Sequence, residues 1–236
     1  MNFPPVLLLA AISGVLAIVS APWALGQPWL NYVFKPATTL LLMLWAWPRG
    51  AGHPMQPWIR RALVCSLAGD VALMWPVSGF LPGLGSFMLA HLAYIVAFTR
   101  GGHRVWWWPA LAFNAVAAAA VLGWLWPSIP ADLQPPVLVY VVALSCMAAL
   151  AAGRWQALRQ DAAQAAQVSG ARLAACGGLL FMLSDSLIAI NKFAGPVPMD
   201  SLWVLVTYWV AQACFVSALP APAATITRSR PWHFAS

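Results

Sequence analysis

The chain has 236 residues, of which 62% are hydrophobic and only 7% are charged, and its formal net charge is +7. Soluble domains carry about 25% charged residues, so this composition excludes a soluble globular protein and indicates a polytopic membrane protein. The positive residues lie in short loops between apolar segments, which is typical of membrane topology, so we expect no nucleic-acid partner.

Eight apolar segments follow one another along the chain, each bounded by Pro, Gly or Arg. A helix needs roughly 20 residues to cross a bilayer, which matches the length of these segments. We therefore expect an all-α integral membrane protein, a bundle of about eight transmembrane helices forming one domain over residues 1–236. The expected helices cover residues 4–21, 29–47, 60–76, 83–99, 105–125, 136–153, 171–191 and 201–219, and a short basic tail follows at 220–236.

The basic residues predict the orientation of this bundle. Ten of the 12 lie after the second, fourth or sixth helix, or in the C-terminal tail. The loops on the other side carry only Lys192, at a helix end. The positive-inside rule then places both termini in the cytoplasm, and we expect the protein in a bacterial inner membrane.

Two of the five acidic residues, Asp70 and Asp185, lie inside apolar segments of membrane length. A carboxylate at the centre of a membrane helix costs about 2.5–3.5 kcal/mol to insert, so its presence there indicates a functional site. At 1.5 Å per residue, Asp70 lies roughly 14 Å and Asp185 roughly 20 Å from the cytoplasmic ends of their helices.

Further polar residues are expected at overlapping depth, in the middle or outer half of the membrane. Tyr94 shares a helix face with His91, and Gln212 shares one with Tyr208, because residues three or four apart are neighbours on a helix. We expect these side chains to surround one cavity with the two aspartates. The expected substrate-binding or supporting residues are Lys35, His91, Tyr94, Asn191, Lys192, Tyr208 and Gln212.

Each supporting residue also has a purely structural interpretation. Lys35 and Asp70 can form a buried ion pair that fixes helix packing. His91 can be a hydrogen-bonded core histidine. Asn191 and Lys192 can be anchors that reach the lipid headgroups.

A metal site is an alternative for the same cluster, because one histidine and two carboxylates (His91, Asp70 and Asp185) suit Zn or Fe. These three residues lie on three different helices whose rotations the sequence does not give, so we expect no metal and no cofactor. The cysteines are scattered through the apolar segments without a CxxC pair, and we interpret them as packing residues. They are Cys65, Cys146, Cys176 and Cys214.

Five stretches of sequence carry a further signal through their order and spacing. They are Phe34–Leu41, Ser66–Leu73, Gly83–Tyr94, Gly178–Ser186 running on to Asn191–Phe193, and Thr207–Gln212. With these stretches the chain resembles the YhhN-like lysoplasmalogenase family over nearly its whole length. The resemblance implies a membrane protein of about eight spans that hydrolyses the vinyl ether bond of lysoplasmalogens, with a lysophospholipid as substrate.

The chemistry of that reaction suits two carboxyl groups. Protonation of the vinyl ether at its β-carbon produces an oxocarbenium ion, the kind of cation that paired carboxylates handle in glycosidases. We hypothesise that Lys35 keeps Asp70 ionised and that Asp185 is the acid; the reverse assignment is the alternative.

The remaining residues receive supporting roles in this hypothesis. His91 and Tyr208 are expected to orient water or the headgroup. Asn191 and Lys192 lie near the outer end and are expected to meet the substrate phosphate.

Two other classes of function compete with an enzyme. A small-molecule or lipid transporter could use the same cluster as a binding site, although transporters usually show inverted repeats and discontinuous helices, which this sequence lacks. A structural membrane protein could use the polar groups for packing alone. Substitution of both aspartates separates these classes, because it should spare folding but abolish turnover only in an enzyme.

Overall fold

The computed structural model describes residues 4–75, 77–100, 107–161, 163 and 165–222, and these residues form helices and connections without a strand. The expected all-α class is therefore confirmed for the described part of the chain. The helices are α1 (Pro5–Val19), α2 (Pro28–Ala46), α3 (Gln56–Ala72), α4 (Phe80–Thr99), α5 (Trp108–Leu125), the short 3₁₀ helix η1 (Trp126–Ser128), α6 (Gln134–Arg159), α7 (Ala165–Phe193) and α8 (Asp200–Ser217).

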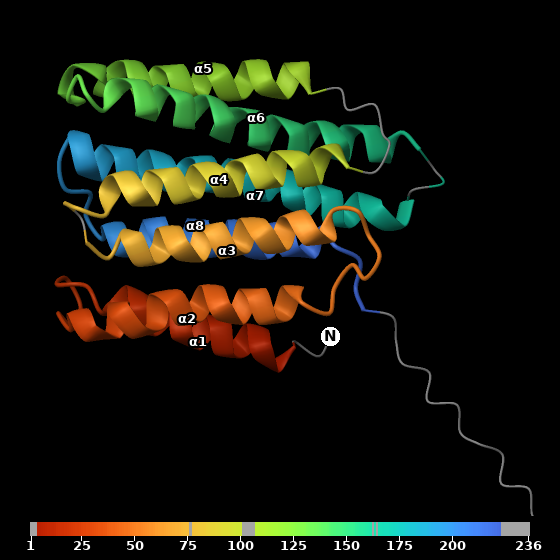
Figure 1. The fold of residues 1–236 in the computed structure, drawn as a ribbon, viewed down its shortest axis with the longest axis horizontal. Coiled ribbons are helices and arrows are strands. Elements are labelled where there is room, and N and C mark those ends of the chain that lie inside the picture. Colours follow the sequence, from red (N-terminus) through yellow and green to blue (C-terminus); the bar gives the residue numbers. More distant parts are fainter. Residues whose placement is uncertain (1–3, 76, 101–106, 162, 164, 223–236) are drawn as a thin grey trace, which may run out of the picture.

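The helices run side by side along one axis (Figure 1). The pair α1 and α2 forms one edge of the bundle, and α5 with α6 forms the opposite edge. Between these edges, α3 packs on α4, and α7 packs on both α6 and α8. The helices α3, α4, α6, α7 and α8 therefore enclose the centre of the molecule, where both aspartates lie.

Four helices are long and apolar enough to cross a membrane by length and composition, namely α4, α5 with η1, α6 and α7. The apolar helix α1 is shorter. The other three helices, α2, α3 and α8, are not among the four candidate spans. They carry Lys35, Asp70 and Gln212, respectively, within their length.

The helices α6 and α7 are longer than the apolar pattern predicts. They continue to Arg159 and begin at Ala165, whereas the expected segments end at 153 and begin at 171. The additional turns contain Arg154 and Gln167, whose side chains are hydrogen-bonded to each other at 3.1 Å. Polar turns that leave the apolar layer can stay helical, so hydropathy alone ends α6 too early and begins α7 too late.

The described arginines gather at one end of the bundle, which we call the arginine end. Here α2, α4, α6 and α8 end and α1 begins (Figure 1). The side chain of Arg49 donates to the carbonyl of Leu219 at 3.0 Å, and Arg154 donates to the carbonyl of Arg100 at 3.0 Å. The arginine end carries Arg49, Arg60, Arg61, Arg100, Arg154, Arg159 and Arg172, whereas Arg104, Arg228 and Arg230 and the basic tail from residue 223 lie outside the described residues.

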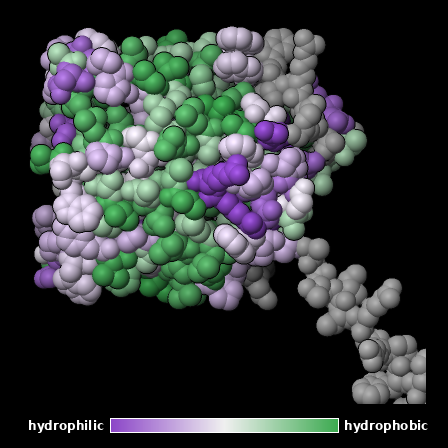
Figure 2. All heavy atoms as spheres, viewed as in Figure 1, coloured by the Kyte–Doolittle hydropathy of each residue, from purple (hydrophilic) through white to green (hydrophobic). Residues whose placement is uncertain are grey.

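The opposite end carries Lys192 on α7 and is called the Lys192 end. A band of hydrophobic side chains lies between the two ends on the face shown in Figure 2. At the arginine end, several arginines lie over tryptophan rings. The guanidinium carbon of Arg61 is 4.4 Å from the ring centre of Trp58, and that of Arg49 is 4.8 Å from the ring centre of Trp45. Cation and indole pairs of this kind are typical of a membrane–water interface.

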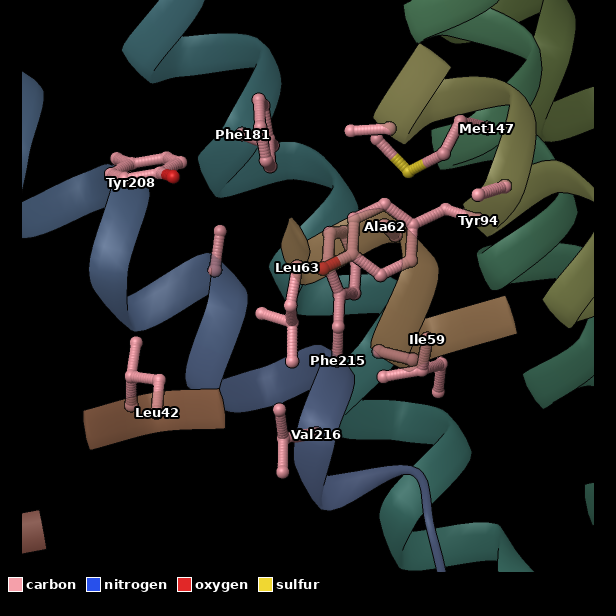
Figure 3. Packing of buried hydrophobic residues seen from close by; sticks show 14 of the residues in the cluster. Leu42, Ile59, Ala62, Leu63, Tyr94, Met147, Phe181, Tyr208, Phe215 and Val216 are labelled. Carbon is pink, nitrogen blue, oxygen red and sulfur yellow. The ribbon is translucent and has the colours of Figure 1, made fainter. Parts of the chain in front are cut away.

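The core next to the aspartates contains several packed aromatic rings. Tyr94 of α4 and Phe215 of α8 have ring centroids 4.5 Å apart, and Phe181 of α7 lies 5.5 Å from Tyr208 (Figure 3). All four side chains are buried. The interlocked rings hold α4, α7 and α8 at one rotation about their axes and thereby direct Tyr208 toward Asp70.

Two glycines bring α7 into direct contact with its neighbours. A Cβ at Gly177 would lie 2.9 Å from the Cβ of Cys214 on α8, and one at Gly178 would lie 2.9 Å from the Cα of Ala148 on α6. Small residues at such crossings allow helix backbones to approach closely. The two glycines therefore set the distance of α7, and of Asp185, from both neighbouring helices.

We expect Gly178→Ala to destabilise the protein by about 1–3 kcal/mol, because the added methyl group must push α6 and α7 apart. Thermal unfolding in detergent measures this loss. Gly123→Ala on α5 is the matched control, since a Cβ there meets nothing within 4 Å, and it should leave the midpoint unchanged or raise it. Equal midpoints for the two variants would contradict this account of the packing.

Candidate active site

Asp70 lies on α3 and is 1% exposed. Its Oδ2 atom accepts hydrogen bonds from the Thr39 hydroxyl at 2.6 Å and from the Tyr208 hydroxyl at 2.9 Å. Trp209 in turn donates to Thr39 at 3.3 Å. Lys35, one turn before Thr39 on α2, interacts electrostatically with the carboxylate. Helices α2, α3 and α8 thus meet at this one carboxyl group.

Asp185 lies on α7, and its side chain is 12% exposed. Its Oδ2 atom accepts a hydrogen bond from the Tyr140 hydroxyl of α6 at 2.6 Å. The Nε2 atom of His91 on α4 lies 3.9 Å from the same oxygen. His91 is fully buried, packs its ring against Tyr140 and Phe181, and has no hydrogen-bond partner on either ring nitrogen among the described residues.

The two aspartates share a small cavity of about 20 Å³, which we call the polar pocket. Lys35 and Tyr208 also line it, so the structure brings together four of the residues that the sequence predicts for one site. The remaining lining residues are Leu73, Phe87, Ser184, Ile188, Val204 and Leu205.

A second cavity of about 270 Å³, the apolar cavity, is also lined by Asp185. Its walls come from α4, α5, α6 and α7 and are almost entirely hydrophobic, with Leu84, Phe113 and Leu144 among them. The few polar side chains in its wall are Asn114, Tyr140, Ser145, Asp185 and Ser186. Asp185 therefore stands at the boundary between an apolar space and a polar one.

Tyr94 and Gln212 lie behind the polar pocket and line neither cavity. The hydroxyl of Tyr94 donates to the Gln212 side-chain oxygen, and the Gln212 amide donates to Ser66 at 2.9 Å. Gln212 also interacts with the Tyr208 hydroxyl. This second layer of hydrogen bonds holds Tyr208 in place beneath Asp70.

Asn191 and Lys192 lie at the end of α7, away from the two carboxyl groups. The Asn191 amide donates to Asp200 at 3.0 Å, and its oxygen accepts from the backbone N–H of Val197 at 2.9 Å. These contacts fasten the connection between α7 and α8. The ammonium of Lys192 lies 5.1 Å from the ring centre of Phe80, which lines the apolar cavity.

Tyr140 and Thr39 are the close partners of the aspartates that sequence reasoning did not include in the predicted site. Tyr140 is far from Asp185 in sequence, and its hydroxyl within the apolar part of α6 was the available signal. Thr39 lies one turn from Lys35 on the same helix face, so its position next to Asp70 could have been inferred from that spacing.

Within the described residues, no group of three or more His, Cys or Asp side chains is placed to hold a metal ion. The structure brings His91 next to Asp185, whereas Asp70 is engaged by Thr39 and Tyr208. Among the described residues, Asp70 accepts hydrogen bonds from two hydroxyl groups and Asp185 from one, and Lys35 interacts with Asp70.

The helices, four of which can span a bilayer, surround the buried Asp70 and the partly buried Asp185. This arrangement defines an integral membrane protein with an internal polar site. Residues 30–219 match the YhhN family. The chain belongs to the YhhN family, as its sequence motifs predict.

Several relatives have names that state an activity. A pig protein named lysoplasmalogenase TMEM86B is 33% identical over 190 residues, which cover 79% of this chain and 74% of the relative. A Mycobacterium bovis protein named lysoplasmalogenase is 34% identical over 187 residues, covering 71% of this chain and 62% of the relative. An Escherichia coli protein named uncharacterized membrane protein YhhN is 28% identical over 130 residues, covering 55% and 62%. No solved structure matches the chain.

Proposed function

We propose that this protein is a lysoplasmalogenase, a membrane-embedded hydrolase that cleaves the vinyl ether bond of a lysoplasmalogen to a fatty aldehyde and a glycerophospho-alcohol. The observation that carries the proposal is the position of Asp185 in the wall of both cavities. A vinyl ether held in the apolar cavity beside this carboxyl group lies next to the polar pocket, which can hold the water that hydrolysis consumes. The relatives named lysoplasmalogenase support the same activity.

The apolar cavity runs along α7 from Leu179 to Phe193, roughly 21 Å of helix. Asp185 lies within this length, and Lys192 is seven residues, roughly 10 Å, nearer the end. In this proposal the phosphate lies toward Lys192, the vinyl ether lies beside Asp185, and the alkenyl chain continues toward Leu179. A lysine ammonium is a suitable point contact for a phosphate.

Asp185 is the proposed general acid. It transfers its proton to the β-carbon of the vinyl ether, and the α-carbon and ether oxygen then share the positive charge of an oxocarbenium ion. Asp185 suits this role because it lines the apolar cavity, where the double bond lies, and because Tyr140 donates to Oδ2, whereas Oδ1 accepts no hydrogen bond from the described residues. Tyr140 and His91 act as positioning residues for this carboxyl group.

Asp70 is the proposed general base and the carboxylate that stabilises the cation. In this proposal its carboxylate form accepts the hydrogen bonds of Thr39 and Tyr208 and lies near the ammonium of Lys35. The polar pocket is large enough for one water molecule between the two carboxyl groups. Asp70 takes a proton from this water as its oxygen bonds to the α-carbon of the oxocarbenium ion, which gives a hemiacetal.

Collapse of the hemiacetal restores both groups. Asp185, now a carboxylate, accepts the proton of the hemiacetal hydroxyl, and Asp70 returns its proton to the departing ether oxygen. The bond between the α-carbon and that oxygen breaks, and the products are the aldehyde and the alcohol. One water molecule is consumed, and each carboxyl group ends in the protonation state in which it began.

We further propose that all eight helices span the bilayer as one domain, with the arginine end in the cytoplasm. The concentration of described arginines at that end supports this orientation through the positive-inside rule. The active site then opens in the half of the membrane away from the cytoplasm, and in a bacterium the membrane is the inner one.

Aldehyde release by the purified protein tests the proposed function. Turnover of a vinyl ether lysophospholipid, with none for the matching ester-linked lysophospholipid, is the expected result. Absence of turnover with choline and ethanolamine headgroups alike would refute the proposal.

We expect Lys192→Gln to raise KM for the lysophospholipid several-fold, with kcat nearly unchanged, because it removes a contact to the phosphate that is equal in the ground and transition states. Initial rates of aldehyde release over a range of substrate concentrations measure both parameters. Arg172→Gln is the matched control, since Arg172 lies on the same helix at the arginine end, and its KM should equal that of the wild type. An unchanged KM for Lys192→Gln would show that Lys192 does not contact the phosphate of the substrate.

A further inference from the structure

The apolar cavity is open on one side, and the exposure of its lining residues locates that side. Its exposed lining residues all belong to α5 or α7, with Phe113 65%, Leu179 50% and Leu183 49% exposed, and Ala117 also exposed. The lining residues from α4 and α6 are buried or partly buried. The opening therefore lies between α5 and α7.

The helix α5 is loosely attached to the rest of the bundle. It lies at the edge of the molecule (Figure 1), packs mainly against α6, and buries only Asn114 and Leu125. It makes few contacts with α7. The opening is thus bordered by a helix whose separation from α7 breaks little of the core.

The rim of the opening is hydrophobic. Leu179 lies in the middle of α7 and Phe113 lies in the second turn of α5, and both helices are long and apolar enough to span a membrane. An opening of this composition and depth faces lipid chains rather than water. Asp185, which lines the same cavity, is reached from the bilayer through it.

We propose that the opening between α5 and α7 is a lateral portal through which the alkenyl chain of the substrate extends from the cavity into the bilayer. The inference rests on the proposed function and specifies how the substrate is held. At about 270 Å³ the cavity is below the usual range of roughly 300–1,000 Å³ for small-molecule sites, so a long chain is not fully enclosed. The end of the chain stays among lipid chains while the vinyl ether reaches Asp185.

Two consequences follow from the portal. The protein selects the headgroup and the vinyl ether linkage, and it tolerates long alkenyl chains of different length, because their ends lie outside the cavity. The two products also separate in different directions. The fatty aldehyde returns to the bilayer between α5 and α7, and the water-soluble glycerophospho-alcohol leaves toward the Lys192 end.

Narrowing the portal tests the proposal. We expect Leu179→Trp to lower the ratio of kcat/KM for a long-chain over a short-chain alkenyl lysophospholipid by about tenfold, because the indole occupies the path of the long chain. Leu173→Trp is the control, since Leu173 lies on the same helix, is 38% exposed and does not line the cavity. An unchanged ratio for Leu179→Trp, or an equal fall in both variants, would overturn the portal.

A binding measurement separates the portal from the chemistry. An alkyl-ether lysophospholipid with a diazirine in the middle of its chain cannot be hydrolysed by this reaction, and it labels the residues that this part of the chain meets. We expect peptides containing Phe113 and Leu179 to be labelled. Labelling of α1 and α2 instead would overturn the portal, whereas labelling at the portal in a protein without turnover would refute the proposed function and leave the portal standing.

Discussion

Replacement of Asp185 by Asn is expected to reduce aldehyde release by about 10²–10⁴-fold, the usual contribution of a positioned general acid. Asparagine has the size of aspartate and can still accept the hydrogen bond from Tyr140, so the packing of α6 and α7 is retained. It has no carboxyl proton to transfer to the β-carbon of the vinyl ether. The rate of aldehyde formation at saturating substrate measures the loss.

The matched control for this variant is Asp132→Asn, because Asp132 is an exposed aspartate in the connection between α5 and α6. The control should keep wild-type activity, and both variants should unfold at temperatures close to that of the wild type. A fully active Asp185→Asn variant would exclude Asp185 as the acid. Loss of activity together with loss of the folded state would favour a structural role instead.

Replacement of Asp70 by Asn is expected to lower kcat by a similar factor of about 10²–10⁴, with a small change in KM. The amide can accept hydrogen bonds from Thr39 and Tyr208, but it cannot remove a proton from water or offset the charge of the cation. Steady-state kinetics with the vinyl ether substrate, over a range of concentrations, separates the two parameters.

A double variant separates catalysis from ion pairing at this site. Lys35→Met alone leaves the buried Asp70 carboxylate without its neighbouring cation and should lower the thermal midpoint, because an unpaired buried charge is destabilising. The combination Lys35→Met with Asp70→Asn removes both charges and should recover much of that stability. If Asp70 is catalytic, the double variant stays inactive. Recovery of activity along with stability would instead show that Lys35 and Asp70 serve only helix packing.

The sequence alone predicted the class of the protein, its family and the two aspartates of the candidate site. These are local properties: a low fraction of charged residues, apolar segments of membrane length and the cost of a carboxylate within them do not depend on which helices touch. The gathering of arginines at one end could be predicted for the same reason, since it follows from their positions between successive helices. Lys35 and Tyr208 were predicted beside the aspartates from their depth in the membrane, because the rise per residue fixes how far each lies from the end of its helix.

Only the tertiary structure decided which side chains meet and where the cavities lie. Helices that are apolar on all sides give no indication of their rotation, so the pairing of Asp185 with Tyr140 could not be derived from hydropathy. The rotation of α7 depends on its close contacts at Gly177 and Gly178 with α8 and α6. The same packing turns Asn191 toward Asp200 and away from the site, and it leaves α5 apart from α7, where the apolar cavity opens.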